Sequence, residues 1–282
     1  MKILVGVDKS EESQLALRYA CHLLEHFAAE VEALYVEPDV VELTRDGAYA
    51  PFTTRTEIER QVEQESNKVL DEIIEGCEVC LGGKIPCEPR LAMGDPAEEI
   101  LREADAGAYD MIVLGGMGQS AFKGLLLGAV SVKVLHHAKQ PVLIVRNYRE
   151  IERILVAYRG SHCDQGALEF IAPLFAKKLP EITIMHVQET ARGESEEFAQ
   201  ACVMTGRDTL VNLGYEPVTK TAQGDFEEEV LKEVAVERYD LVVLGAYGHQ
   251  IPKYLPVISD EALNLARLTT RPVLVFREFK EE

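Results

Sequence analysis

The residues best placed to do chemistry are glycines that follow an apolar run. Met111–Leu114 is continuous and apolar, as expected for a parallel strand buried on both faces. Gly115-Gly116-Met117-Gly118 follows it, and nine residues later Gly128 precedes a predicted helix over about 129–138. Glycines let the backbone approach a ligand closely, and a helix start offers unpaired N–H groups at the positive end of its dipole. The pattern predicts an anion cradle, although a tight strand exit followed by a glycine helix start would explain it equally well.

The sequence contains a duplication, which indicates the elements that position this loop. Residues 94–118 recur without a gap as residues 224–248, with 12 of 25 positions identical. Met1-Lys-Ile-Leu-Val-Gly begins the first copy and Arg153-Ile-Leu-Val-Ala the second. At 282 residues the chain has the length of two domains. We therefore predict domains at residues 1–148 and 149–282.

Each copy alternates strands and helices. This order predicts an α/β fold of two tandem parallel five-stranded sheets with helices on both faces, similar to a Rossmann fold. Such sheets bind ligands beyond the carboxyl ends of their strands, at the switch in strand order. In the first copy the segments at these ends are Asp8–Ser10, Val36–Pro38 and Gly115–Gly128. The elements expected in the first copy are strands Lys2–Val7, Val31–Val36, about 87–92, Met111–Leu114 and Val142–Val145, and helices over about 11–29, 54–75, from 96 and 129–138. Ser10 is the expected N-cap of the first helix, and Asp95-Pro96 is the expected start of the helix from 96.

The overall composition narrows the class of partner. A net charge of −19 argues against nucleic acid and anionic membranes, which are held by Lys and Arg patches. The sequence has no apolar run of 18 residues, and its N-terminus has a strand pattern rather than that of a signal peptide. We expect a cytoplasmic protein.

Four separated motifs occur in the same order in both copies, more weakly in the second. They are Val-Gly-Val-Asp-Lys-Ser-Glu-Glu-Ser (5–13), Gly94-Asp95-Pro96, the spacing Gly-x2-Gly-x9-Gly, and Val-x-Val-Leu-x-x-Ala-x-x-Pro-Val-Leu-Ile-Val (132–145). Together they resemble the universal stress protein family, as a tandem pair over essentially the whole chain. The resemblance implies a stress-response regulatory protein that binds ATP, or a related adenine nucleotide such as AMP or ADP, with or without Mg²⁺, in its first domain.

The resemblance also implies which residues hold the nucleotide. Asp8 would meet the ribose, and the backbone of Val36 the adenine. The remaining expected binding residues are Val7, Gly115, Met117, Gly118, Gly128, Ala129, Val130 and Ser131. The family has Ser or Thr where this chain has Ala129, so one hydroxyl donor to the phosphates is missing. Such a donor is worth about 1 kcal/mol to a neutral acceptor and about 1.5–3 to a charged one. Ser131 is a candidate to compensate.

The second copy departs further from the pattern. Arg159 stands where the first copy has Asp8. Gly245-Ala-Tyr-Gly248 is retained, yet the sequence has no glycine after Gly248, and Pro252 and Pro256 remove backbone donors. We predict a silent second site that serves as a scaffold or partner surface.

Two other functions remain open. One is an enzyme acting on ATP, whose hydrolysis would be slow because neither a placed general base nor an arginine finger is evident; we propose no catalytic residue. Lys123 and Lys133 could place a positive charge near the phosphates of the ligand, or they could equally be solvated surface residues. The other function is a partner-binding module that uses no nucleotide. As for assembly, in similar proteins the last strand pairs across a two-fold axis; here Val142–Val145 and Val273–Phe276 would pair within one chain as a pseudo-dimer, and a further homodimer is open.

Three motifs have competing interpretations, and we predict no metal site from them. Cys77-x2-Cys80-x6-Cys87 is absent from the second copy and is compatible with a metal site or a redox pair, although incidental cysteines are the preferred interpretation. His22-Leu-Leu-Glu25-His26 matches an inverted zinc-peptidase pattern but has no third ligand. Gly116-x-Gly118-x-x-Ala121 matches a dinucleotide fingerprint but does not follow the first strand of its unit.

Overall fold

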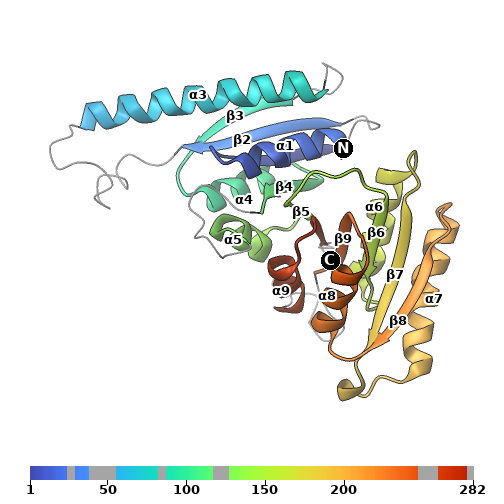
Figure 1. Ribbon diagram of the computed structural model, residues 1–282. Helices are drawn as coiled ribbons and strands as arrows, with labels where there is room; N and C mark the ends of the chain where they lie inside the picture. The colour runs from blue at the N-terminus through green and yellow to red at the C-terminus, as the bar shows by residue number, and fades with distance from the viewer. Residues whose placement is uncertain (24–28, 38–54, 82–86, 117–126, 247–259, 278–282) are drawn as a thin grey trace.

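The structure is a computed structural model that describes residues 1–23, 29–37, 55–81, 87–116, 127–246 and 260–277. Within these ranges the side chains of residues 55, 77–81 and 260 are not described. The described chain has the alternating order of strands and helices that the sequence predicts (Figure 1).

The first half contains five parallel strands and their connecting helices. Its strands are β1 (Lys2–Val7), β2 (Glu30–Glu37), β3 (Cys87–Met93), β4 (Met111–Gly115) and β5 (Val142–Val145). Its helices are α1 (Glu11–Leu23), α3 (Arg55–Leu81), α4 (Pro96–Ala106) and α5 (Ala129–His137). Two expected helix ends differ: α1 is described only to Leu23 and residue 29 is not helical, whereas the sequence predicts a helix to about 29, and α3 continues six residues beyond the predicted stop.

The second half repeats this arrangement. Its strands are β6 (Arg153–Ala157), β7 (Glu181–Gln188), β8 (Val218–Gln223), β9 (Leu241–Gly245) and β10 (Val273–Phe276). Its helices are α6 (His162–Phe175), the short 3₁₀ helix η1 (Thr190–Arg192), α7 (Glu196–Asn212), α8 (Phe226–Val236) and α9 (Asp260–Leu268).

The ten strands form one continuous sheet in the order β3-β2-β1-β4-β5-β10-β9-β6-β7-β8. Each half is parallel internally, and the halves meet where β5 pairs antiparallel with β10, with Leu143 opposite Leu274. The predicted pairing of the two last strands within one chain is therefore confirmed. The two five-stranded sheets expected from the sequence are joined edge to edge, because each last strand covers the open edge of the other.

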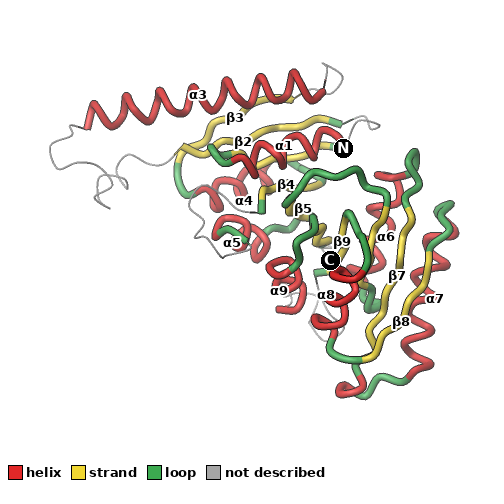
Figure 2. Tube along the Cα trace, viewed as in Figure 1, coloured by secondary structure: helices red, strands yellow, loops and turns green. Residues whose placement is uncertain are grey.

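Helices cover both faces of the sheet (Figure 2). In the first half α1 and α3 pack together on one face, and α4 and α5 pack together on the other. In the second half α6 and α7 form one pair, and α8 and α9 the other. This double cover explains the uninterrupted apolar runs, since all of Met111–Leu114 and Val142–Val145 is buried.

Side-chain caps begin α4, α6, α7 and α8, and the cap at Asp95 was expected from the sequence. Asp95 accepts a hydrogen bond from the Glu98 amide at 2.9 Å, and Asp225 accepts the equivalent bond from Glu228 at 3.1 Å. Ser161 and Ser195 cap α6 and α7. Each cap satisfies an amide that the helix itself leaves open, worth about 1 kcal/mol.

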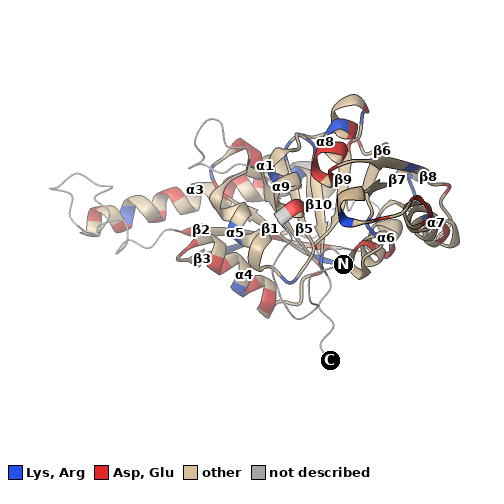
Figure 3. Cartoon of the chain, turned by 90° about the horizontal axis from the view of Figure 1, so that it is seen from below, with Lys and Arg blue, Asp and Glu red and all other residues tan. Residues whose placement is uncertain are grey.

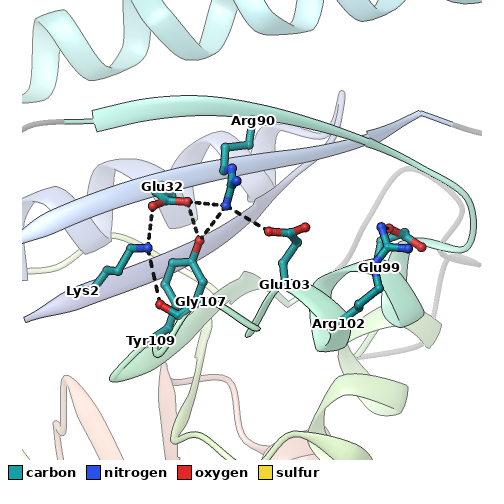
Figure 4. A network of polar contacts seen from close by, with 8 residues as sticks. All are labelled: Lys2, Glu32, Arg90, Glu99, Arg102, Glu103, Gly107 and Tyr109. Carbon is teal, nitrogen blue, oxygen red and sulfur yellow. Dashed lines mark hydrogen bonds and ion pairs between the residues drawn. The ribbon is translucent and has the colours of Figure 1, made fainter. Parts of the chain in front are cut away.

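A charged network closes the amino-end side of the first half (Figure 4). Lys2 Nζ lies 2.7 Å from Glu32, and Arg90 lies 2.9 Å from both Glu32 and Glu103. The Tyr109 hydroxyl also donates to Glu32. Burial by itself raises the pKa of Glu32, but these donors and cations outweigh it and hold that pKa below its ordinary value.

Acidic residues recur along α3, α4 and α8 (Figure 3). This agrees with the excess of 48 Asp and Glu over 29 Lys and Arg in the sequence. Among the described helices, none combines the length and the apolar character needed to span a lipid bilayer.

Candidate functional site

The first-half residues expected to hold a nucleotide gather at the carboxyl edge of the sheet, where the strand order reverses. Asp8 directly follows β1 and Gly115 ends β4, and these two strands are parallel neighbours. β1 is also paired with β2, whose last residues include Val36. The connections leave β1 and β4 in opposite directions, which is the arrangement that opens a crevice in parallel α/β sheets.

The Asp8 carboxylate is held by the start of α1. Its Oδ1 accepts hydrogen bonds from the Ser10 amide at 2.9 Å and from the Ser10 hydroxyl. Ser13 closes the same turn, because its hydroxyl accepts from the Asp8 amide at 3.0 Å and donates to the Asp8 carbonyl at 2.8 Å. The predicted cap is confirmed, since Ser10 Oγ accepts from the Ser13 amide at 3.2 Å. Asp8 is therefore fixed in orientation at the mouth of the crevice.

Two of the glycines are explained by packing. A Cβ at Gly115 would lie 2.8 Å from the carbonyl carbon of Glu12 and 3.0 Å from the Ser13 amide, so the start of α1 requires a glycine there. A Cβ at Gly116 would lie 3.0 Å from Arg146 Cγ. Tight packing, the alternative explanation of this motif, thus accounts for both residues whatever the loop binds.

The start of α5 supplies the donors that a phosphate needs. Gly128 is its N-cap residue, and the Gly128 amide donates to the Gly116 carbonyl at 2.8 Å. The first bond of the helix runs from the Val132 amide to the Gly128 carbonyl. Among the residues that the structure describes, no side chain caps this helix and none accepts from the amides of 129–131. Three N–H groups at the positive end of a helix dipole therefore lie beside the end of β4.

Two neighbouring side chains are committed elsewhere. Ser131 is buried, and its hydroxyl donates to the Gly115 carbonyl at 2.9 Å. Ser131 consequently ties α5 to β4 and does not replace the hydroxyl missing at Ala129, as considered from the sequence. Lys133 pairs with Asp95 at 3.1 Å and Glu98 at 2.9 Å, so its charge is directed to the start of α4.

Part of the expected site lies outside the described residues. Met117, Gly118 and Lys123 belong to this part, as do Gly248, Pro252 and Pro256 of the second half. The site residues that the structure does describe are Val7, Asp8, Val36, Gly115, Gly128, Ala129, Val130 and Ser131.

Comparison with known proteins decides the family. The model of the universal stress protein family matches twice, at residues 1–146 and 150–277. The chain belongs to the universal stress protein family. It is 36% identical over 148 residues to universal stress protein YxiE of Bacillus subtilis, a match that covers 51% of this chain and 98% of that protein. It is 28% identical over 173 residues to universal stress protein Slr1230 of Synechocystis, with 61% of this chain and 59% of that protein covered.

Solved structures show the same fold over the whole chain. A universal stress protein from Archaeoglobus fulgidus superimposes with a TM-score of 0.75 at 24% identity, covering 100% of this chain and 97% of that one. A putative universal stress protein from Pseudomonas aeruginosa gives a TM-score of 0.66 at 16% identity, covering 98% and 92%. The tandem arrangement of this universal stress protein is thus shared by solved structures.

At the equivalent edge of the second half, partly or fully buried charged side chains contact one another. Arg159, in the position of Asp8, is 5% exposed and lies 4.4 Å from the ring centroid of Phe226. Its guanidinium is 3.8 Å from Glu261, which Arg192 also contacts at 2.9 Å. Arg192 lies 3.2 Å from Glu189 in turn. Burial raises the pKa of Glu189. Burial also acts to raise the pKa of Glu261, but the hydrogen bond from Arg192, a backbone hydrogen bond and the charges of Arg159 and Arg192 together outweigh it and lower that pKa.

Asp164 is buried beside Arg159 at the same edge of the sheet. It stands in the position of Ser13, and its Oδ2 accepts from the amides of Arg159 and Ser161 at 3.0 and 2.9 Å. Its Oδ1 accepts from the Gly245 amide at 3.1 Å, at the end of the strand equivalent to β4. Burial raises the pKa of this carboxyl. A protein carboxyl group thus accepts from the backbone at the ends of both neighbouring strands.

The cysteine and histidine motifs are only partly described. Cys87 is disulfide-bonded, which corrects the preferred interpretation of incidental cysteines and favours the oxidised pair. Cys21, Cys163 and Cys202 are buried and form no disulfide bond; the remaining cysteines of the sequence are Cys77 and Cys80. His22 packs against the Tyr148 ring and lies 3.2 Å from Lys178. The described residues contain no cluster of three potential metal ligands.

Sequence reasoning overlooked two arginines. Arg146 and Arg277 each follow the last strand of their copy, and each crosses to the other half. The available signal was their repetition at equivalent positions, after Val-Leu-Ile-Val and Val-Leu-Val-Phe.

Proposed function

We propose that this universal stress protein binds one adenine nucleotide per chain, in the crevice of its first half, and acts as a regulator rather than as an efficient enzyme. ATP is the expected ligand, with AMP and ADP as the related candidates. The first half, residues 1–148, carries the site, and the second half, residues 149–282, is its scaffold. Asp8 binds the ribose, the backbone of Val7 and Val36 faces the adenine, and the α5 amides hold the phosphates.

The observation that carries this proposal is the start of α5. Its three amides lie beside Gly115 and Gly116, at the switch point of the sheet. β4, which ends at Gly115, is the parallel neighbour of β1, which Asp8 follows. An anion bound there would complete the hydrogen bonds that the helix leaves open, and it would gain from the dipole. Any Mg²⁺ would be bound through the phosphates of the nucleotide, because the described residues contain no cluster of three potential metal ligands.

Calorimetric titration with ATP, ADP, AMP and adenosine tests the proposal, together with acid extraction of nucleotide from the purified protein. We expect one site per chain. At about 100 times its Kd the ligand should stabilise the fold by about 2.7 kcal/mol. Replacing the carboxylate in Asp8→Asn should weaken all four ligands about tenfold or more, because the ribose is common to them.

Glu11→Gln is the matched control, since Glu11 is exposed in the first turn of α1. Its affinities should equal those of the wild type. Two equivalent sites per chain, or no heat from any of the four ligands at millimolar concentration, would refute the proposal. The second result would leave the partner-binding module as the function.

A further inference from the structure

Two arginines cross between the halves in the same way. Arg146 follows β5, and its Nη2 donates to the Ala266 carbonyl near the end of α9. Arg277 follows β10, and its Nη2 donates to the Leu135 carbonyl near the end of α5. Leu135 is the seventh residue of α5 and Ala266 the seventh of α9, so the two bonds are equivalent. Each half therefore donates hydrogen bonds to carbonyls near the end of the last helix of the other half.

Arg277 is the more deeply enclosed of the two, with 2% exposure. Its Nη1 also donates to the Ala138 carbonyl, and it lies 3.4 Å from the His136 carbonyl. The last carbonyls of a helix have no partners within the helix, and a cation at that end is favoured by the dipole. The fan of guanidinium donors satisfies several of them at once, which a lysine cannot do in the same way.

The same helix carries the phosphate donors at its other end. α5 has nine residues, which corresponds to about 13 Å of rigid rod. Its first turn is held to the sheet by Ser131 and by the bond between Gly128 and Gly116. Its last turn is held by Arg277. The direction in which the three open amides point therefore depends on contacts at both ends.

We propose that Arg277 is a positioning residue for phosphate binding: the second half orients α5, and thereby sets the affinity of the first half for the phosphates of its ligand. The inference rests on the proposed function, and it gives the silent half a role in the site. Residues 1–148 alone would lack Arg277 and its hydrogen bonds to the end of α5.

The test compares Arg277→Met, Arg277→Lys and wild type in the full chain, well below their melting temperatures. Titration with ATP and with adenosine separates phosphate binding from binding of the nucleoside. We expect Arg277→Met to weaken ATP about fivefold or more, in the range of coupling changes transmitted through packed elements, and adenosine less than about twofold. Arg277→Lys should fall between. Hydrogen exchange should become faster at the amides of α5.

Asn147→Ala is the matched control, because Asn147 also crosses between the halves, with its Nδ2 3.3 Å from the Thr270 carbonyl, but holds no part of α5. It should leave both affinities unchanged. Arg146 is unsuitable, since its side chain lies against Gly116.

The outcomes separate the two proposals. A lower melting temperature with unchanged ATP affinity would make Arg277 purely structural and overturn the inference while the proposed function stands. Equal weakening of ATP and adenosine would also overturn it. If wild type binds no adenine ligand, the proposed function is refuted and the inference with it. Should Arg277→Met fail to fold, the ratio of ATP to adenosine affinity in Arg277→Lys decides.

Discussion

Ala129 begins α5 and Asp260 begins α9, so the two residues hold equivalent positions in the two halves of the sheet. The next residue changes from Val130 to Glu261, and Glu261 already pairs with Arg159 and Arg192. The helix start that is neutral in the first half is thus acidic in the second. Carboxylates at a helix start take the place of a bound anion, which is the physical reason why we propose one site per chain.

Ala129→Asp should transfer this property to the first half. The added carboxylate would repel the phosphates and compete for the α5 amides, so ATP affinity should fall at least about tenfold, equal to about 1.4 kcal/mol. Adenosine affinity should stay within a factor of about two. Titration of both ligands checks this.

Ala129→Asn is the control, because it has nearly the same shape without the charge. Comparable losses of ATP affinity in the two variants would show that bulk rather than charge is responsible, and would contradict the role assigned to the helix start.

Ala129→Ser should strengthen ATP binding. Ala129 is exposed at the start of α5, so a serine hydroxyl there has room to donate to a phosphate. A gain of about 1 kcal/mol or more corresponds to roughly fivefold in Kd or more. Ala129→Gly serves as the comparison without a hydroxyl. Adenosine should bind equally to both variants. If the serine variant binds ATP no more tightly than the glycine variant, the phosphates do not lie at this position.

Ser131→Ala should destabilise the fold. The substitution removes the donor to the Gly115 carbonyl, which costs about 0.5–1.5 kcal/mol, and more if that carbonyl stays unsatisfied. Urea denaturation measures the change. Ala262, the equivalent residue of the second half, shows that the helix itself tolerates alanine. An unchanged unfolding midpoint would mean that water replaces the hydroxyl.

Glu32→Gln should make stability less dependent on acid pH. The folded-state pKa of Glu32 lies below its ordinary value of 4.5, because the hydrogen bonds from Lys2 and Tyr109 and the charges of Lys2 and Arg90 together outweigh the effect of burial. A lowered pKa contributes stability that is present above the unfolded value and is lost as the pH falls through the folded value. The variant should therefore be less stable than wild type at pH 7, and the difference should shrink below about pH 4.

Melting temperatures of both proteins between pH 3 and 7 check this. Glu63→Gln, an exposed change on α3, should show no such trend. A constant gap between wild type and Glu32→Gln at every pH would assign the effect to shape rather than to charge.

The cysteines should react in two classes. Burial raises the pKa of Cys202 to about 11, so its thiolate is scarce at pH 8 and alkylation of the native protein should be slow. Cys87 should stay unmodified until a reductant is added, because it is disulfide-bonded. Peptide mapping before and after reduction would identify its partner. Modification of Cys87 without reductant would contradict the disulfide.

The sequence by itself determined the local architecture of this protein. Apolar runs such as Met111–Leu114 predicted the buried parallel strands, and Asp95-Pro96 and Ser10 predicted helix starts, because burial and capping depend on residues close together in the chain. The duplication predicted the two halves of the fold, and the four motifs predicted the family. The comparison of Asp8 with Arg159 already indicated which half would differ.

Only the tertiary structure decided how the halves act on each other. Residue 115 must be glycine because a side chain there would clash with the backbone of α1, and the Ser131 hydroxyl donates to the Gly115 carbonyl. Neither contact can be predicted from the spacing of residues along the chain. The carboxyl of Asp164 reaches Gly245 across 81 positions, and Arg277 reaches Leu135 across 142. Contacts of this separation arise from the pairing of β5 with β10 and from the packing of the helices on the sheet, so they follow from the assembled fold rather than from any one segment.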